Sequence, residues 1–230
     1  MYFVGLDIWY WIMLAPALLL GLWAQMRVRS SFAEAEQVQA PISGAGAARH
    51  VLDSAGLQSV GIEPIEGFLS DHYDPTQKVL RLSPHVFQGY SMAAVGIAAH
   101  EAGHALQDAQ RYAPLAIRNA AVPAANFGGG ISMLLIFLGA MISPKLVIVG
   151  IVCYGAVVFF QLVNLPVEFD ASRRAKQQLD ALGIVPRQDQ QYVNNVLNAA
   201  AWTYVAGTLQ AVMTLLYFVL RFGGASSSNE

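Results

Sequence analysis

Two histidines and a glutamate lie close together in the stretch Ala98-Ala-His-Glu-Ala-Gly-His-Ala105. His100 and His104 are four residues apart, so on an α-helix they project from the same face, one turn apart. Their imidazole nitrogens can then reach one metal ion at about 2.0–2.1 Å. Glu101 follows the first histidine, where a carboxylate can take a proton from water that the metal activates. The stretch therefore predicts hydrolytic chemistry at a metal ion.

The His-Glu-x-x-His pattern is typical of zinc peptidases. A catalytic zinc site also needs a third protein ligand and an open position. The single cysteine, Cys153, excludes a multi-cysteine site, so histidine and carboxylate side chains must supply the ligands. Gln110 stands six residues after His104, where a third histidine would extend the pattern. The alternative interpretation is an alanine-rich core helix whose histidines align by chance.

A downstream carboxylate is the remaining kind of third ligand. Glu168 stands out because it follows Pro166 at the end of an apolar stretch, where a charge is costly unless it has a partner. A zinc ion would be such a partner; the alternative is a solvated carboxylate or a pair with Arg173. The other acidic candidates in the polar segments are Asp108, Asp170, Asp180 and Asp189.

The element that carries the motif is predicted to be a helix from Met92 to about Tyr112. Ser91 is suited to cap its first turn, and Pro114 to close it. Its apolar beginning, Met92–Ala99, is too short to cross a bilayer, which argues against a site inside the membrane. A second helix through Ala47–Ala55 is predicted upstream, capped by Ser43 and stopped by Gly56.

Two short strands are predicted before the motif helix, at Val60–Ile65 and Lys78–Ser83. A turn-rich cluster, Ser70-Asp-His-Tyr-Asp-Pro75, joins them. Either His72 or Tyr73 in this cluster could donate a hydrogen bond to the oxyanion of the reaction, although His72 could equally stabilise the turn. The Lys78–Ser83 strand either binds an extended substrate by strand addition or is an ordinary internal strand.

The composition indicates a membrane protein. Hydrophobic residues make up 55% of the chain and charged residues 12%, and the mean hydropathy is +0.44. The net charge of −2 gives no sign of nucleic-acid binding. Residues 4–24 are nearly all apolar and long enough to span a bilayer. We expect a retained anchor there rather than a cleaved signal peptide, because Arg27 and Arg29 follow the apolar run instead of preceding it.

The chain is predicted to form a mostly α membrane protein with four transmembrane helices. Two polar segments would together form a small cytoplasmic α+β, zincin-like catalytic domain. The predicted parts are an anchor at 1–26, a catalytic segment at 27–122, a transmembrane hairpin at 123–165, a helical segment at 166–200, a fourth transmembrane helix at 201–221 and a flexible tail at 222–230.

The basic residues predict the orientation. All of the 13 lysines and arginines except Lys145 and Arg221 lie in the two polar segments. The positive-inside rule therefore places these segments in the cytoplasm and both termini outside the plasma (inner) membrane. Small-residue faces near 128–130 and 150–155 could pack helices within or between chains.

Five stretches together resemble the YugP-like membrane zinc metallopeptidases, distant relatives of the prenyl-protein proteases. They are Ser70-Asp-His-Tyr-Asp-Pro75, Lys78-Val-Leu-Arg-Leu-Ser83, Ala99-His-Glu-Ala-Gly-His104, Leu165-Pro-Val-Glu-Phe-Asp-Ala-Ser-Arg-Arg174 and Val196-Leu-Asn-Ala-Ala-Ala-Trp-Thr-Tyr-Val205. The resemblance covers most of the chain and implies a neutral, gluzincin-type enzyme. It implies His100, His104 and Glu168 as ligands of one Zn²⁺ per chain, with Glu101 as the catalytic base.

One position departs from the wider clan, whose members often carry an aspartate four residues after the liganding glutamate. Ser172 stands there in this chain. A carboxylate that orients a ligand histidine is therefore in doubt at this position, and Asp108 is a possible substitute.

The predicted function is a zinc metalloendopeptidase that acts on membrane-associated proteins or peptides at the cytoplasmic membrane surface. The alternatives are a zinc-dependent hydrolase of non-peptide amides or lipids, and a catalytically silent metal-binding scaffold. Glu101 argues against the scaffold, because it is the one motif residue that binds no metal. The sequence does not specify the oligomeric state.

Overall fold

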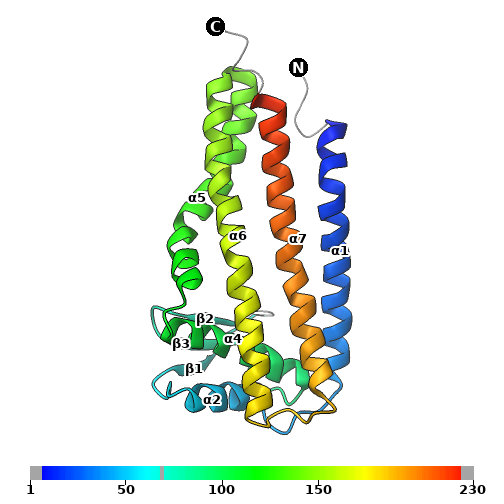
Figure 1. The fold of residues 1–230 in the computed structure, drawn as a ribbon, viewed down its shortest axis with the longest axis vertical. Coiled ribbons are helices and arrows are strands. Elements are labelled where there is room, and N and C mark those ends of the chain that lie inside the picture. The colour runs from blue at the N-terminus through cyan, green and yellow to red at the C-terminus, as the bar shows by residue number, and fades with distance from the viewer. Residues whose placement is uncertain (1–6, 68–69, 224–230) are drawn as a thin grey trace. The chain divides into compact units, whose positions relative to one another are not determined.

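The computed structural model describes residues 7–67 and 70–223. The chain is mostly helical and contains one small sheet (Figure 1). In chain order its elements are α1 (Ile8–Glu36), α2 (Gly44–Ser54), β1 (Gly61–Pro64), β2 (His72–Asp74), β3 (Val79–Leu82), α3 (Pro84–Phe87), α4 (Met92–Ala109), α5 (Ala113–Ile142), α6 (Pro144–Ala181) and α7 (Gln190–Phe222). The first residues of the predicted anchor, 1–6, and most of the predicted tail, 224–230, lie outside the described residues.

The chain divides into two compact units. Unit 1 comprises Met1–Trp23, Ile117–Leu165 and Thr203–Glu230. Unit 2 comprises Ala24–Ala116 and Pro166–Trp202, so two stretches far apart in the sequence fold together in it. All the residues that the sequence singles out for chemistry belong to unit 2.

Among residues 7–67 and 70–223, four helices are long and apolar enough to cross a membrane: α1, α5, α6 and α7. Within unit 1, α5 and α6 form a hairpin that turns at Ser143, as the sequence predicts. Glycines let their backbones approach closely: a methyl group at Gly128 would lie 2.7 Å from the Cys153 carbonyl oxygen. One at Gly150 would lie 2.9 Å from the Ser132 carbonyl oxygen. The small-residue faces therefore pack these two helices within one chain.

The sheet of unit 2 has the strand order β1-β3-β2. β3 is the central strand, parallel to β1 and antiparallel to β2. Its side chains Val79, Leu80 and Leu82 are buried. Of the two interpretations of Lys78–Ser83, the internal strand is confirmed, because β3 is already paired along both edges.

The prediction of a plain turn at Ser70–Pro75 is wrong, because His72–Asp74 forms β2. The aspartates of this stretch nevertheless accept hydrogen bonds from backbone amides. Asp74 Oδ1 accepts from the Thr76 amide at 2.8 Å, as a turn residue does, whereas Asp71 Oδ1 accepts at 2.8 Å from the Ser83 amide, which is 12 residues further on. A strand of three residues is too short to show an alternating pattern, so the turn residues at its ends dominate the sequence signal.

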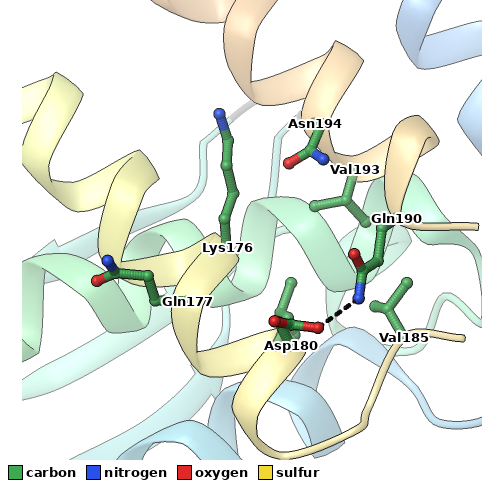
Figure 2. A pocket seen from close by; sticks show the side chains of 8 residues that line it. Lys176, Gln177, Asp180, Val185, Gln190, Val193 and Asn194 are labelled. Carbon is green, nitrogen blue, oxygen red and sulfur yellow. Dashed lines mark hydrogen bonds between the residues drawn. The ribbon is translucent and has the colours of Figure 1, made fainter. Parts of the chain in front are cut away.

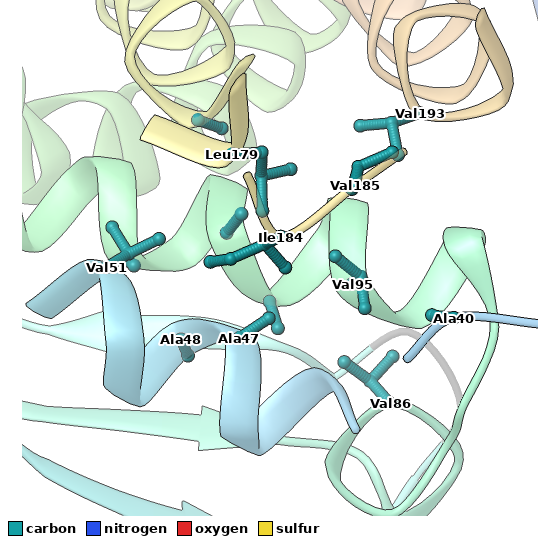
Figure 3. Packing of buried hydrophobic residues seen from close by; sticks show 14 of the residues in the cluster. Ala40, Ala47, Ala48, Val51, Val86, Val95, Leu179, Ile184, Val185 and Val193 are labelled. Atoms are coloured by element: carbon teal, nitrogen blue, oxygen red, sulfur yellow. The ribbon is translucent and has the colours of Figure 1, made fainter. Parts of the chain in front are cut away.

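The core of unit 2 joins both of its stretches. Figure 3 shows Val51 of α2 and Val95 of α4 in one cluster with Ile184, which follows α6, and Val193 of α7. Val51 and Val95 are fully buried. This packing places α4 in contact with α2 from its own stretch and with the end of α6 and the start of α7 from the other.

Candidate metal centre

Helix α4 presents the two histidines from one face, as the spacing predicts. Ser91 caps the helix, its side chain accepting a hydrogen bond from the Ala94 amide at 3.1 Å. The ring centroids of His100 and His104 lie 4.8 Å apart. Both rings are largely buried, with side-chain exposures of 14% and 11%.

Glu168 of α6 reaches both histidines. Its Oε2 lies 3.3 Å from Nε2 of His100 and 3.7 Å from Nε2 of His104. One ligand atom from each of the three residues lies within 4.8 Å of the others. Ligand atoms arranged tetrahedrally around zinc are about 3.3 Å apart, and the two distances from Glu168 are close to this value. Two imidazole nitrogens and a carboxylate oxygen are also a donor set that suits zinc. The structure thus brings the three residues together from two stretches of unit 2.

The other acidic candidates have different partners in the structure. Asp108 accepts from Tyr73 and Lys78. Asp170 is paired with Arg173 and Arg174. Asp180 accepts from Gln190.

Glu101 is buried beside His100, with 9% of its surface exposed. Its pKa is raised to about 7, mainly because burial disfavours the charged carboxylate. His100 and His72 oppose this shift in pKa, while the charges of Glu168 and Asp71 add to it. A carboxyl group that titrates near neutral pH is suited to accept a proton and return it.

The electrostatic environment of His100 favours positive charge. Burial alone would lower its pKa, but the hydrogen bond with Glu168 and the charges of Glu101 and Glu168 outweigh burial and raise it. The carboxylates that stabilise a proton there also favour a divalent cation.

Each histidine of the candidate metal site has a hydrogen-bond partner at its Nδ1 nitrogen. Nδ1 of His100 lies 3.1 Å from Oγ of Ser172, the residue that stands where the wider clan often has aspartate. Nδ1 of His104 lies 3.0 Å from Oε1 of Gln107. The suggestion that Asp108 orients a ligand histidine is wrong, because its carboxylate contacts Tyr73 and Lys78 instead. Sequence reasoning missed Gln107, although its place three residues after His104 puts the two side chains on neighbouring positions of one helix.

The two candidate oxyanion donors differ in their surroundings. His72 is close enough to Glu101 to lower the pKa of that carboxyl group. Its Nδ1 lies 2.8 Å from the Ser70 carbonyl oxygen, which can only accept, so Nδ1 carries the proton. Tyr73 donates its hydroxyl proton to Oδ2 of Asp108 at 2.7 Å, and burial, together with this bond, raises the Tyr73 pKa.

A separate cavity of about 240 Å³ lies in unit 2 between the end of α6 and the start of α7. Its lining includes Lys176, Asp180, Gln190 and Val193 but none of the three residues of the candidate metal site. Figure 2 shows the hydrogen bond from Gln190 to Asp180 across it. Lys176, which also lines this cavity, donates to Oδ1 of Asn198 at 2.6 Å.

Comparisons with known proteins identify the family of the chain. A family model described as "Putative neutral zinc metallopeptidase" matches residues 10–223. The chain is 46% identical over 217 residues to the protein named "Putative membrane protease YugP" of Bacillus subtilis (strain 168), covering 93% of this chain and 96% of that relative. No solved structure matches the chain. The chain therefore belongs to the membrane protein family described as putative neutral zinc metallopeptidases.

Proposed function

We propose that this chain is an integral membrane zinc metalloendopeptidase. The observation that carries the proposal is the convergence of His100, His104 and Glu168 beside the buried carboxyl group of Glu101. His100, His104 and Glu168 would hold a zinc ion, whose Lewis acidity would activate water and polarise a carbonyl group. Glu101 would accept the proton of the attacking water and pass it to the leaving amine, a task that its pKa of about 7 suits.

A peptide substrate is favoured by the position of β2. This strand pairs with β3 along one edge, and within residues 7–67 and 70–223 no strand pairs with its other edge. His72, at the start of β2, is close enough to Glu101 to influence its pKa. An extended peptide that added to this edge would pass close to Glu101, and its backbone would supply the hydrogen bonds.

The proposed location is the cytoplasmic surface of the plasma (inner) membrane, with both termini outside. Two features support it: the concentration of lysine and arginine in the two polar segments, and the place of Glu168 directly after the third apolar stretch. Substrates would then be membrane-associated proteins or peptides.

The test is to purify the full chain in mild detergent and to compare it with Glu101→Gln in zinc content and in cleavage of casein. We expect both proteins to bind one zinc per chain. We expect Glu101→Gln to lose about 10²-fold or more in cleavage rate, because the general base is gone. Glu66→Gln makes the same chemical change on an exposed loop residue and should keep full activity.

Two outcomes would contradict the proposal in different ways. If the native chain binds zinc but does not cleave casein, the protein is a metal-binding membrane protein and not a general peptidase. Failure of the native chain to bind zinc would overturn the ligand assignment itself.

A further inference from the structure

Gln107 is an uncharged polar residue in the interior of unit 2. Its side chain is fully buried, with 0% exposure, on the face of α4 that meets α6. Its amide makes three contacts. Oε1 lies 3.0 Å from Nδ1 of His104, and Nε2 lies 2.7 Å from the Val167 carbonyl oxygen and 3.0 Å from Oδ2 of Asp170. A buried amide with every contact made is held in one orientation.

The orientation of this amide follows from its partners. The Val167 carbonyl and the Asp170 carboxylate are both acceptors, so they require the NH₂ group of Gln107. The reverse orientation would place the amide oxygen against two other oxygens. The oxygen of Gln107 must therefore face His104.

The protonation of His104 follows in turn. An acceptor at Nδ1 requires the ring to carry its proton there, which leaves the lone pair on Nε2. Nε2 is the atom that faces Glu168, at 3.7 Å. Ser172 does not determine which nitrogen of His100 carries the proton, because a hydroxyl group can either donate to Nδ1 or accept from it.

Asp170 is in turn anchored by two arginines. Arg174 and Arg173 both pair with its carboxylate, and Arg174 also donates to Gln110, just after α4. The negative charge of Asp170 polarises the Gln107 amide and so strengthens its oxygen as an acceptor. A ligand histidine that donates to a stronger acceptor is a more basic metal ligand.

We infer that Gln107 is a positioning residue for His104. It fixes the ring with Nε2 free to bind metal, and it connects this ligand to the buried charge of Asp170. The inference rests on the proposed metal centre but not on peptidase activity. At many zinc sites a carboxylate contacts the ligand histidine directly. In this chain the Gln107 amide lies between His104 and the Asp170 carboxylate and contacts both.

The test measures zinc affinity of the full chain in detergent by competition with a chromophoric chelator. Gln107→Met keeps the length and burial of the side chain but removes the acceptor, and we expect about 10–100-fold weaker zinc binding. Gln190→Met is the matched control. It removes a hydrogen bond to Asp180 of α6 that has no part in the contacts of His104, Gln107 and Asp170, and zinc affinity should stay within about threefold of the native value.

¹⁵N spectra of the histidine rings in the metal-free chain give a second readout. His104 should carry its proton on Nδ1 in the native chain and populate both tautomers in Gln107→Met.

Three results would overturn the inference: native affinity in Gln107→Met, an equal loss in Gln190→Met, or a His104 proton that stays on Nδ1 alone in Gln107→Met. If the native chain itself fails to bind zinc, the metal centre is overturned instead. The two failures are therefore distinguishable.

Discussion

Gly103 of α4 lies directly against the backbone carbonyl of Ala171 on α6. A methyl group added at Gly103 would stand 2.6 Å from that oxygen and 3.2 Å from the carbonyl carbon. Both atoms belong to the backbone, so neither can rotate away. This contact sets the separation of the two helices that carry the candidate metal ligands.

Gly103→Ala should therefore disrupt the metal centre. We expect an overpacking cost of about 1–3 kcal/mol, partly offset by the roughly 1 kcal/mol that alanine gains over glycine within a helix. Zinc affinity should fall as well, because the helices must move apart. Unfolding in detergent and chelator competition measure the two effects. Gly96→Ala on the same helix is the control: its nearest contact, a Val193 methyl at 3.2 Å, can yield, so zinc affinity should be unchanged.

Glu168→Gln should abolish the stabilisation of the chain by zinc. A ligand that binds only the folded state raises the unfolding free energy by about 2.7 kcal/mol at 100 times its Kd. We expect the native chain to melt at higher temperature when zinc is added, and the variant to show no such shift. A zinc-dependent rise of equal size in Glu168→Gln would show that the third ligand lies elsewhere.

The Asp74 carboxylate should make the β2–β3 hairpin sensitive to acid. Its pKa is lowered from the ordinary 3.8, first by the Gln77 amide and then by Arg81. A lowered pKa stabilises the folded state above pH 3.8, and this contribution is lost as the pH falls through the folded value. The stability difference between the native chain and Asp74→Asn should stay constant from about pH 7 to 5 and close below about pH 4. Thermal melting across this range checks it, and a gap that widens in acid would contradict it.

Replacing His72 and replacing Tyr73 should have different effects, the first on catalysis and the second on stability. His72→Ala removes a side chain beside Glu101, and we expect kcat/KM to fall by about 10²-fold with zinc affinity unchanged. Tyr73→Phe removes the hydrogen bond to Asp108, so we expect a loss of about 1 kcal/mol in stability and little change in kcat. Steady-state kinetics on casein and unfolding curves distinguish them. The reverse pattern would assign the oxyanion contact to Tyr73.

The features of this molecule that depend on a single stretch of chain could be predicted from the sequence. The helix α4 follows from the capping residue Ser91, and the shared face of His100 and His104 follows from their spacing. The four apolar helices follow from the length and composition of their runs. Each of these features is determined within a single stretch of chain.

The features that escaped prediction depend on contacts between distant stretches. Gln107 contacts Val167 and Asp170, about 60 residues further on, and no local pattern indicates which side chain of α6 will face it. β2 exists as a strand because β3 supplies its hydrogen bonds. The choice of Ser172 rather than Asp108 as the partner of a ligand histidine likewise depends on how α4 and α6 are aligned.

The order in which the ligands occur along the chain has a consequence for biosynthesis. All of α5 and the first part of α6 separate His104 from Glu168. A ribosome must complete the α5–α6 hairpin before the third member of the His100–His104–Glu168 group exists. A chain that stalls or is cut within the hairpin holds two histidines and no third ligand, so the nascent protein cannot assemble this centre before its membrane hairpin has been made.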